Sequence, residues 1–100
     1  MSVDQAAVPV RRVDVRLVHE GYDCVLATPG EPATHLLNPT ARALWELCDG
    51  TTEPSEMVVA VCELFSVSYE VAASDVAAAL EALTQAGLVT WGPPGGQGES

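Results

Sequence analysis

The chain has 100 residues, of which 48% are apolar, and a formal net charge of −10. It carries fourteen acidic residues against four arginines and no lysine, so it lacks the clustered basic side chains that bind nucleic acid or an anionic membrane surface. The length predicts one small globular domain, and the absence of a signal peptide or of an apolar run near the roughly 18 residues of a membrane span predicts a cytoplasmic protein.

The first third of the chain predicts short strands after a flexible arm over residues 1–10. From position 13, apolar residues alternate with charged ones, the period of a half-buried strand: Val13, Val15 and Leu17. Turn-forming residues then divide the sequence into a turn at 19–21, a strand at 22–27, a turn at 28–32 and a strand at 33–37. Short strands joined by short turns predict a three-stranded antiparallel sheet.

Three helices are expected next, each with apolar residues at positions i, i+3, i+4 and i+7. Asn38 can cap the first helix, Pro39 suits the first helical position, and Gly50 is expected to end this helix in the left-handed conformation. The second helix is expected over 52–65 and the third over 68–87. The apolar stripes are Ala41, Leu44, Trp45 and Cys48; Met57, Val58, Val61, Cys62, Leu64 and Phe65; and Val76, Ala79, Leu80 and Leu83.

The last part of the chain predicts a helix end, a short extended piece and a tail. Gly87 can close the third helix while Leu88 folds back on its last turn. Residues 88–91 are expected to be extended, and residues 92–100, rich in glycine and proline, to form a disordered tail. The sequence therefore predicts one domain over residues 11–91 between an arm and a tail.

No residue pattern predicts a catalytic or metal site. Cys24, Cys48 and Cys62 are an odd number without the paired spacing of zinc ligands, and we expect them to be reduced and buried. No serine, cysteine or carboxylate is paired in sequence with a histidine as nucleophile and base would be. We therefore expect a protein that is not an enzyme and holds no cofactor.

Several polar residues leave two interpretations open. Arg42 either pairs with Glu46 one helical turn later or meets an acidic group of a partner. Asp75 and His35 are either solvent-facing residues or contacts to a bound molecule. The acidic residues of the helices form either a solvated face or a surface that docks a basic partner: Glu46, Asp49, Glu53, Glu56 and Glu63. Trp91 either packs back on the sheet or lies exposed as a contact.

Together, the motif LNPTARALWELCDG, a second helix ending in ELF, and a third helix with Asp75, Leu80 and Leu83 before Gly87-Leu88 resemble the PqqD family. These are small peptide chaperones, or RiPP recognition elements, that serve ribosomally synthesised and modified peptides. The likeness runs from about residue 13 to residue 89. It implies an α+β, winged-helix-like domain in which a three-stranded antiparallel sheet is followed by a three-helix bundle.

The resemblance also implies a site and two partners. The leader of a precursor peptide would dock as an extra strand in the cleft between the third strand and the third helix, and a modifying enzyme, often a radical SAM enzyme, would act on the same peptide. The implied peptide-binding residues are Ala33, Thr34, His35, Leu36 and Leu37 on the strand and Ala72, Asp75, Val76, Ala79 and Leu83 on the helix. Family members often carry a bulkier residue where this chain has Ala79, which implies a roomier pocket.

Two alternatives belong to other functional classes. A winged-helix transcription regulator would share the three helices, but its recognition helix should be basic, whereas the third helix has Glu70, Asp75 and Glu81 and no Lys or Arg. A structural subunit could instead dimerise through the unpaired edge of the third strand.

Overall fold

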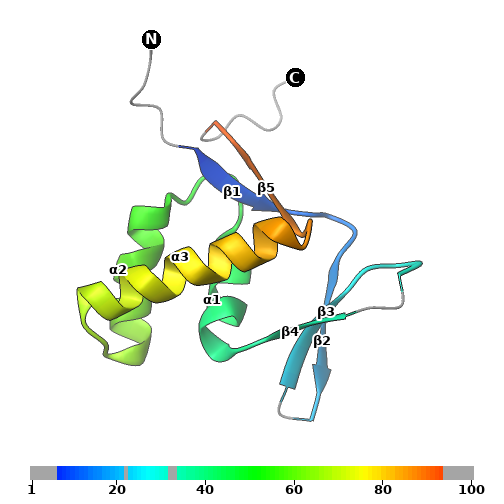
Figure 1. Ribbon diagram of the computed structural model, residues 1–100, viewed down its shortest axis with the longest axis horizontal. Coiled ribbons are helices and arrows are strands. Elements are labelled where there is room, and N and C mark those ends of the chain that lie inside the picture. The colour runs from blue at the N-terminus through cyan, green and yellow to red at the C-terminus, as the bar shows by residue number, and fades with distance from the viewer. Residues whose placement is uncertain (1–6, 22, 32–33, 94–100) are drawn as a thin grey trace.

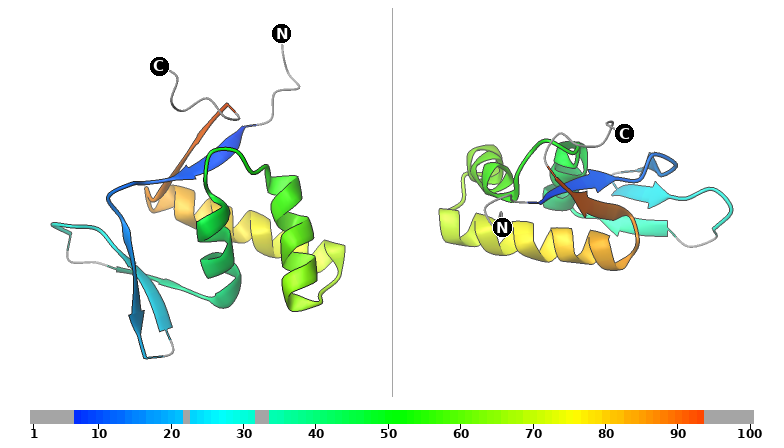
Figure 2. Two further views of the ribbon diagram at one scale, coloured as in Figure 1. Left: turned by 180° about the vertical axis from the view of Figure 1, so that it is seen from behind. Right: turned by 90° about the horizontal axis from the view of Figure 1, so that it is seen from above.

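The computed structural model describes residues 7–21, 23–31 and 34–93. Its elements are β1 (Val8–Arg11), β2 (Arg16–Glu20), β3 (Asp23–Ala27), β4 (Thr34–Leu37), α1 (Pro39–Leu47), α2 (Pro54–Phe65), α3 (Tyr69–Gln85) and β5 (Val89–Gly92). Helices α1 and α2 pack on the same side of the long helix α3 (Figures 1 and 2). The β2-β3-β4 meander lies beyond the C-terminal end of α3, and β1 and β5 form a separate pair along another edge of the helices (Figure 1). The mixed α+β architecture agrees with the prediction.

Strands β2, β3 and β4 form the expected antiparallel meander, in the order β2-β3-β4. The predicted turn at 19–21 is wrong in its first two residues, because β2 continues through them and pairs His19 with Cys24. The turn begins at Gly21, whose φ of 65° suits a glycine. The first strand also starts later than predicted, since Val13 is fully exposed and precedes it.

A second sheet, formed by β1 and β5, was not predicted. Residues 8–10 were expected in a loose arm, but Val8 is fully buried and the strand pairs with β5 in the register Val8↔Gly92 and Arg11↔Val89. The partner strand lies about 80 residues away in sequence, and Pro9 interrupts the alternation of apolar and polar residues in β1. No local sequence pattern therefore predicts this pairing. Residues 1–6 of the expected arm and 94–100 of the expected tail lie outside the described residues.

Strand β1 also holds the end of α1. The guanidinium of Arg11 donates from Nη1 to the carbonyl oxygens of Trp45 (3.3 Å), Glu46 (3.1 Å) and Cys48 (3.4 Å). A cation at a helix C-terminus meets the negative end of the helix dipole and adds hydrogen bonds to the carbonyl groups of the last turn. The unpredicted strand therefore supplies the basic side chain that the last turn of α1 lacks.

Most helix ends follow the predicted local chemistry. The Asn38 side chain accepts a hydrogen bond from the Ala41 N–H at 2.7 Å, and Pro39 is the first residue of α1. Ser68 caps α3 through a bond from the Val71 N–H at 3.2 Å. Gly87, with a φ of 77°, closes α3, and the Leu88 N–H donates to the Leu83 carbonyl at 3.0 Å. This closure turns the chain back so that Leu88 is buried.

Two predicted helix ends are corrected. Helix α1 stops at Leu47, before Gly50, and the N–H of Gly50 donates instead to the carbonyl of Pro9 at 3.1 Å. Helix α2 begins after Glu53 rather than at Thr52, because the Asp49 carboxylate engages Thr52 in the connecting turn. The Glu56 side chain then accepts from the Glu53 N–H at 2.9 Å, as in a capping box.

The core lies where α1, α2, α3 and the inner face of the sheet meet. Its buried members include Leu26, Leu37, Leu44, Trp45, Met57, Val61, Val76, Leu80, Leu83 and Leu88. Trp45 is in the core as predicted, whereas Leu64 and Phe65, predicted on the α2 stripe, are 63% and 38% exposed at the helix end. All three cysteines are free; Cys24 and Cys48 are buried and Cys62 is half-buried. Burial raises the pKa of Cys48 to about 12.

Within the described residues, no single helix is long and apolar enough to cross a membrane; α2 and α3 reach that composition only together, across a bend of 118°.

The turn after α1 predicts a specific pH dependence of stability. The backbone N–H groups of Thr51 and Thr52 each donate to the Asp49 carboxylate at 2.9 Å and lower its pKa to about 2. Because this pKa is lower than the value of about 4 in an unfolded chain, the stabilisation is complete above about pH 4 and is lost as pH falls toward 2. Thermal melts of Asp49→Ala should therefore fall below wild type at pH 6 and converge with it near pH 2. A gap that does not change with pH would contradict this.

Candidate functional site

Strand β4 is an open edge next to a cleft. Strand β3 pairs with one side of β4, and no other described strand pairs with its second side. A cleft of about 310 Å³ lies between β4, the start of α1 and the C-terminal half of α3. Its lining residues are His35, Leu36, Asn38, Thr40, Ala41, Asp75, Ala78, Ala79, Ala82 and Leu83. Free backbone groups beside a cleft offer a template for an added strand whose side chains enter the cleft.

The strand wall of the cleft is partly apolar and exposed. Leu36 is 64% exposed on the free edge strand of the sheet. His35 is half-buried, and Leu37, pointing to the opposite face from Leu36, is buried in the core. Leu36 is therefore an apolar side chain that faces solvent beside the cleft.

The helix wall is low because it is built from alanine. Ala78 and Ala82 are exposed and Ala79 is half-buried, so each contributes one methyl group to the wall. Asp75 stands one turn before Ala79, is exposed, and forms no ion pair within the described parts of the chain. A bound segment with a bulky apolar side chain next to a cationic one would fill the space above the alanines and pair with the Asp75 carboxylate.

The structure brings together half of the predicted site residues. Those that line the cleft are His35, Leu36, Asp75, Ala79 and Leu83. Thr34 is on β4 and exposed but does not line the cleft, and Leu37 is in the core. Ala33 lies outside the described residues.

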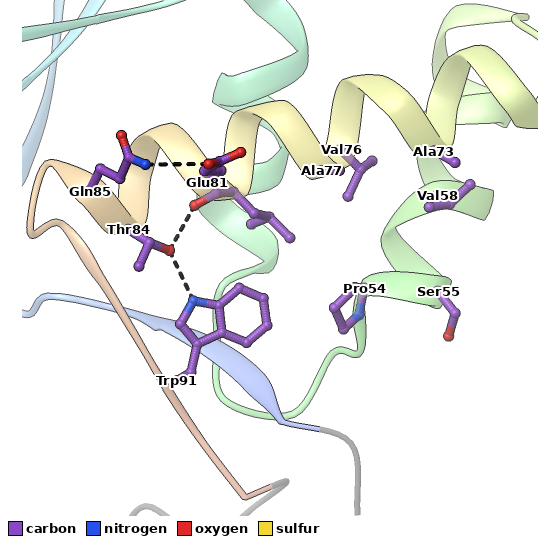
Figure 3. Close-up of a pocket in the computed structure, with 11 residues that line it drawn as sticks. Pro54, Ser55, Val58, Ala73, Val76, Ala77, Glu81, Thr84, Gln85 and Trp91 are labelled. Atoms are coloured by element: carbon purple, nitrogen blue, oxygen red, sulfur yellow. Dashed lines mark hydrogen bonds between the residues drawn. The ribbon is translucent and has the colours of Figure 1, made fainter.

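Ala72 and Val76 are placed elsewhere, contrary to their predicted role in the cleft wall. Ala72 is fully buried and Val76 is 2% exposed, because the apolar stripe of α3 packs on the other helices. Val76 instead borders a second hollow, about 600 Å³ in volume, on the other flank of α3 (Figure 3).

The cleft residues that the prediction missed were Asn38, Thr40, Ala41, Ala78 and Ala82. The signal that could have found the alanines is helical spacing: positions 75, 78, 79 and 82 share one face of an α-helix. Asn38 takes part in both features: its side-chain oxygen caps α1, and the residue also borders the cleft.

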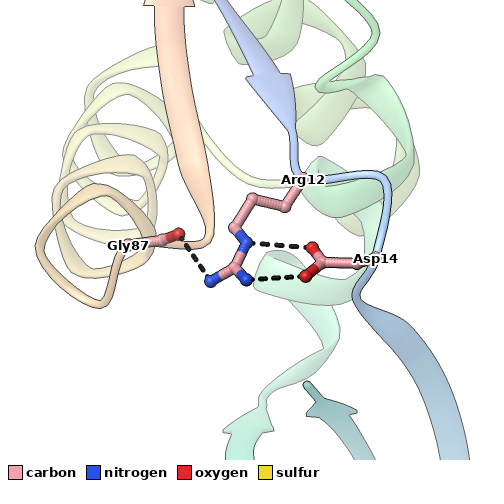
Figure 4. Close-up of polar contacts among 3 residues, drawn as sticks. All are labelled: Arg12, Asp14 and Gly87. Atoms are coloured by element: carbon pink, nitrogen blue, oxygen red, sulfur yellow. Dashed lines mark hydrogen bonds and ion pairs between the residues drawn. The ribbon is translucent and has the colours of Figure 1, made fainter. Parts of the chain in front are cut away.

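A polar contact ties the sheet to the end of α3 (Figure 4). The Arg12 guanidinium donates to both Asp14 oxygens, at 3.0 and 2.7 Å, and to the Gly87 carbonyl at 3.4 Å. The hydrogen bonds from Arg12 lower the pKa of Asp14. This is the only ion pair among the described residues. Arg42 and Glu46 therefore do not form the intrahelical pair, which was one of the two interpretations of Arg42. The contact spans the link from β1 to β2 and so helps to orient the meander beside α3.

Comparisons with known proteins bear on the same region. A family described as coenzyme PQQ synthesis protein D (PqqD) matches residues 23–89. A solved structure, TbiB1 in complex with the TbiA(beta) leader peptide, aligns with a TM-score of 0.66 at 22% identity, covering 91% of this chain and 98% of that chain. That likeness shows the same fold. No curated protein sequence matches the chain.

The capping contact of Asn38 predicts that replacing this residue with alanine lowers the stability of the domain. Asn38→Ala deletes the acceptor for the Ala41 N–H and should lower the free energy of unfolding by about 1 kcal/mol. Asn38→Asp keeps an oxygen at the cap and serves as the control. Urea unfolding followed by circular dichroism measures both variants, and an alanine variant as stable as wild type would refute the capping role.

Proposed function

The chain belongs to the PqqD family, and on this premise we propose that it is a non-catalytic chaperone for the leader of a ribosomally synthesised precursor peptide. The leader adds as a strand to the free edge of β4, and the bound precursor is presented to a separate modifying enzyme. A radical SAM enzyme is the class of partner that the family favours. The cytoplasm, where ribosomes release the precursor, is the proposed location.

One observation carries this proposal: the unpaired edge of β4 runs beside a cleft that has an exposed leucine on one wall and alanines on the other. An added strand gains affinity from main-chain hydrogen bonds and specificity from pockets for alternate side chains. The solved relative TbiB1 holds a leader peptide, which supports the same use of the fold here.

The energetics assign most of the affinity to side chains. Strand β4 has four residues, so about four backbone hydrogen bonds at roughly 1 kcal/mol each would be nearly cancelled by an association cost of at least about 4 kcal/mol. Each fully buried apolar leader side chain adds about 2 kcal/mol, whereas micromolar binding needs about 8 kcal/mol. Several leader side chains must therefore contact the cleft, and the low alanine wall gives bulky ones room.

The two alternative functions are less well supported. Helix α3 has no basic residue and three acidic ones, which opposes a recognition helix for DNA, and nothing in the family match points to a regulator. Dimerisation through β4 would use the edge that the leader needs. It would also bring together two chains that each carry a net charge of −10.

Filling the cleft should abolish leader binding. Ala79→Trp places an indole where the leader side chain would lie, and Ala82→Trp does so from an exposed position that should not disturb the core. Calorimetric titration with the N-terminal half of the precursor encoded beside this gene should show at least a tenfold weaker affinity for both variants, about 1.4 kcal/mol or more.

The matched control is Ala77→Trp, an exposed alanine of the same helix that lines the opposite groove. This variant should bind the leader like wild type. Equal affinity of Ala82→Trp and wild type would reject the cleft as the binding site, and sedimentation without peptide would reveal whether a dimer occupies the edge.

Strand addition also predicts where backbone protection appears. Hydrogen exchange of amides in β4 should slow when the leader binds, because some of its N–H groups gain partners. The other edge strand of the sheet, β2, is the internal control and should not change. Protection confined to α3 would mean that the peptide lies in the cleft without joining the sheet.

A further inference from the structure

A second groove lies on the opposite flank of α3 from the cleft. It has a volume of about 600 Å³ and is bounded by the start of α2, by α3 and by β5. Its floor is apolar, with Val58, Val76 and Leu80, and Pro54 and Trp91 stand at its sides (Figure 3). We call it the Trp91 groove.

The side chain of Trp91 is 40% exposed and is hydrogen-bonded to α3. Its Nε1–H donates to the Thr84 Oγ1 at 2.9 Å, and the Thr84 hydroxyl donates to the Leu80 carbonyl at 2.7 Å (Figure 3). An indole held in this way loses little further freedom when a partner covers it. Exposed, ordered tryptophans of this kind often dominate the energy of protein interfaces.

The charges around the groove define what can occupy it. Among the residues that line the groove, Glu81 is the charged one, and we call it the acidic rim. The chain has no Lys or Arg after Arg42. A second copy of this chain, with a net charge of −10, would bring further acidic residues to an acidic rim. A partner segment with an apolar side chain next to a Lys or Arg would contact the apolar floor and pair with the acidic rim. The cation could also stack on the indole of Trp91.

We propose that the Trp91 groove is the docking surface for the modifying enzyme, which contributes a basic segment with an apolar anchor. This inference rests on the proposed function, because it takes the enzyme as the partner. Helix α3 separates the groove from the cleft: Ala77 lines the groove, and its neighbour Ala78 lines the cleft. Leader and enzyme therefore bind to opposite flanks of one helix and can be held at the same time.

The adjacent alanines allow a reciprocal test. Ala77→Trp and Ala78→Trp change neighbouring exposed residues of α3, so their cost to the fold should be similar, and thermal melts verify this. The probes are the purified modifying enzyme encoded beside this gene and the synthetic leader, each titrated separately by thermophoresis. Ala77→Trp should weaken enzyme binding at least tenfold and leave leader binding unchanged, and Ala78→Trp should do the reverse.

The acidic rim is tested with a matched pair of charge removals. Glu81→Gln should weaken enzyme binding several-fold at low salt and reduce its dependence on salt, because it deletes a rim charge. Glu63→Gln, an exposed position that lines neither groove, should leave both properties unchanged. Equal effects of the two variants would mean that only the overall charge attracts the enzyme and would overturn the groove as the site.

The outcomes separate this inference from the proposed function. If wild type binds the leader and Ala77→Trp binds the enzyme like wild type, the Trp91 groove is rejected and the leader site stands. If Ala78→Trp loses enzyme binding and Ala77→Trp keeps it, the docking surface lies on the cleft side of α3. If wild type does not bind the leader at all, the proposed function fails, and enzyme binding lost in Ala77→Trp would still support the groove.

Discussion

Helix α3 buries one stripe of side chains, with Val76, Leu80 and Leu83 at its centre, against α1, α2 and the sheet, and this packing decides which other residues of the helix face solvent. A helix with one buried stripe has two flanks, and here each flank borders a concave surface. The low alanine wall of one flank and the tryptophan-bounded groove of the other therefore have the same origin. A substitution that rotated α3 by a fraction of a turn would alter both surfaces together.

Local chemistry made much of the fold predictable. Asn38-Pro39, Ser68 and Gly87 determine helix ends through bonds to residues only a few positions away, and the alternation after Val13 indicated the meander although its limits shifted. Strand β1 was not predictable in this way, since its partner is at the other end of the chain. The end of α1 was misplaced for the same reason: Arg11, which caps it, comes from that strand.

The candidate site was predicted in part, and the errors have a physical cause. Family resemblance predicted a cleft between the third strand and the third helix, and the structure has a cleft there. A stripe of apolar residues on a helix first fills the core, however, so Ala72 and Val76 are buried. Small residues just beside that stripe, Ala78 and Ala82, complete the wall together with Ala79. The position of Trp91 required β5, because its indole reaches Thr84 only after the chain reverses at Gly87.

The antiparallel pairing of β1 with β5 sets Val8 opposite Gly92, so the described chain enters and leaves the domain at one corner. That corner adjoins Trp91, which precedes Gly92 directly. A second protein joined directly before Val8 or directly after Gly92 would thus be tethered beside the same groove, and a short linker would hold it there at a millimolar effective concentration. The topology therefore makes a junction at Val8 and a junction at Gly92 nearly equivalent for an engineer building a single-chain assembly.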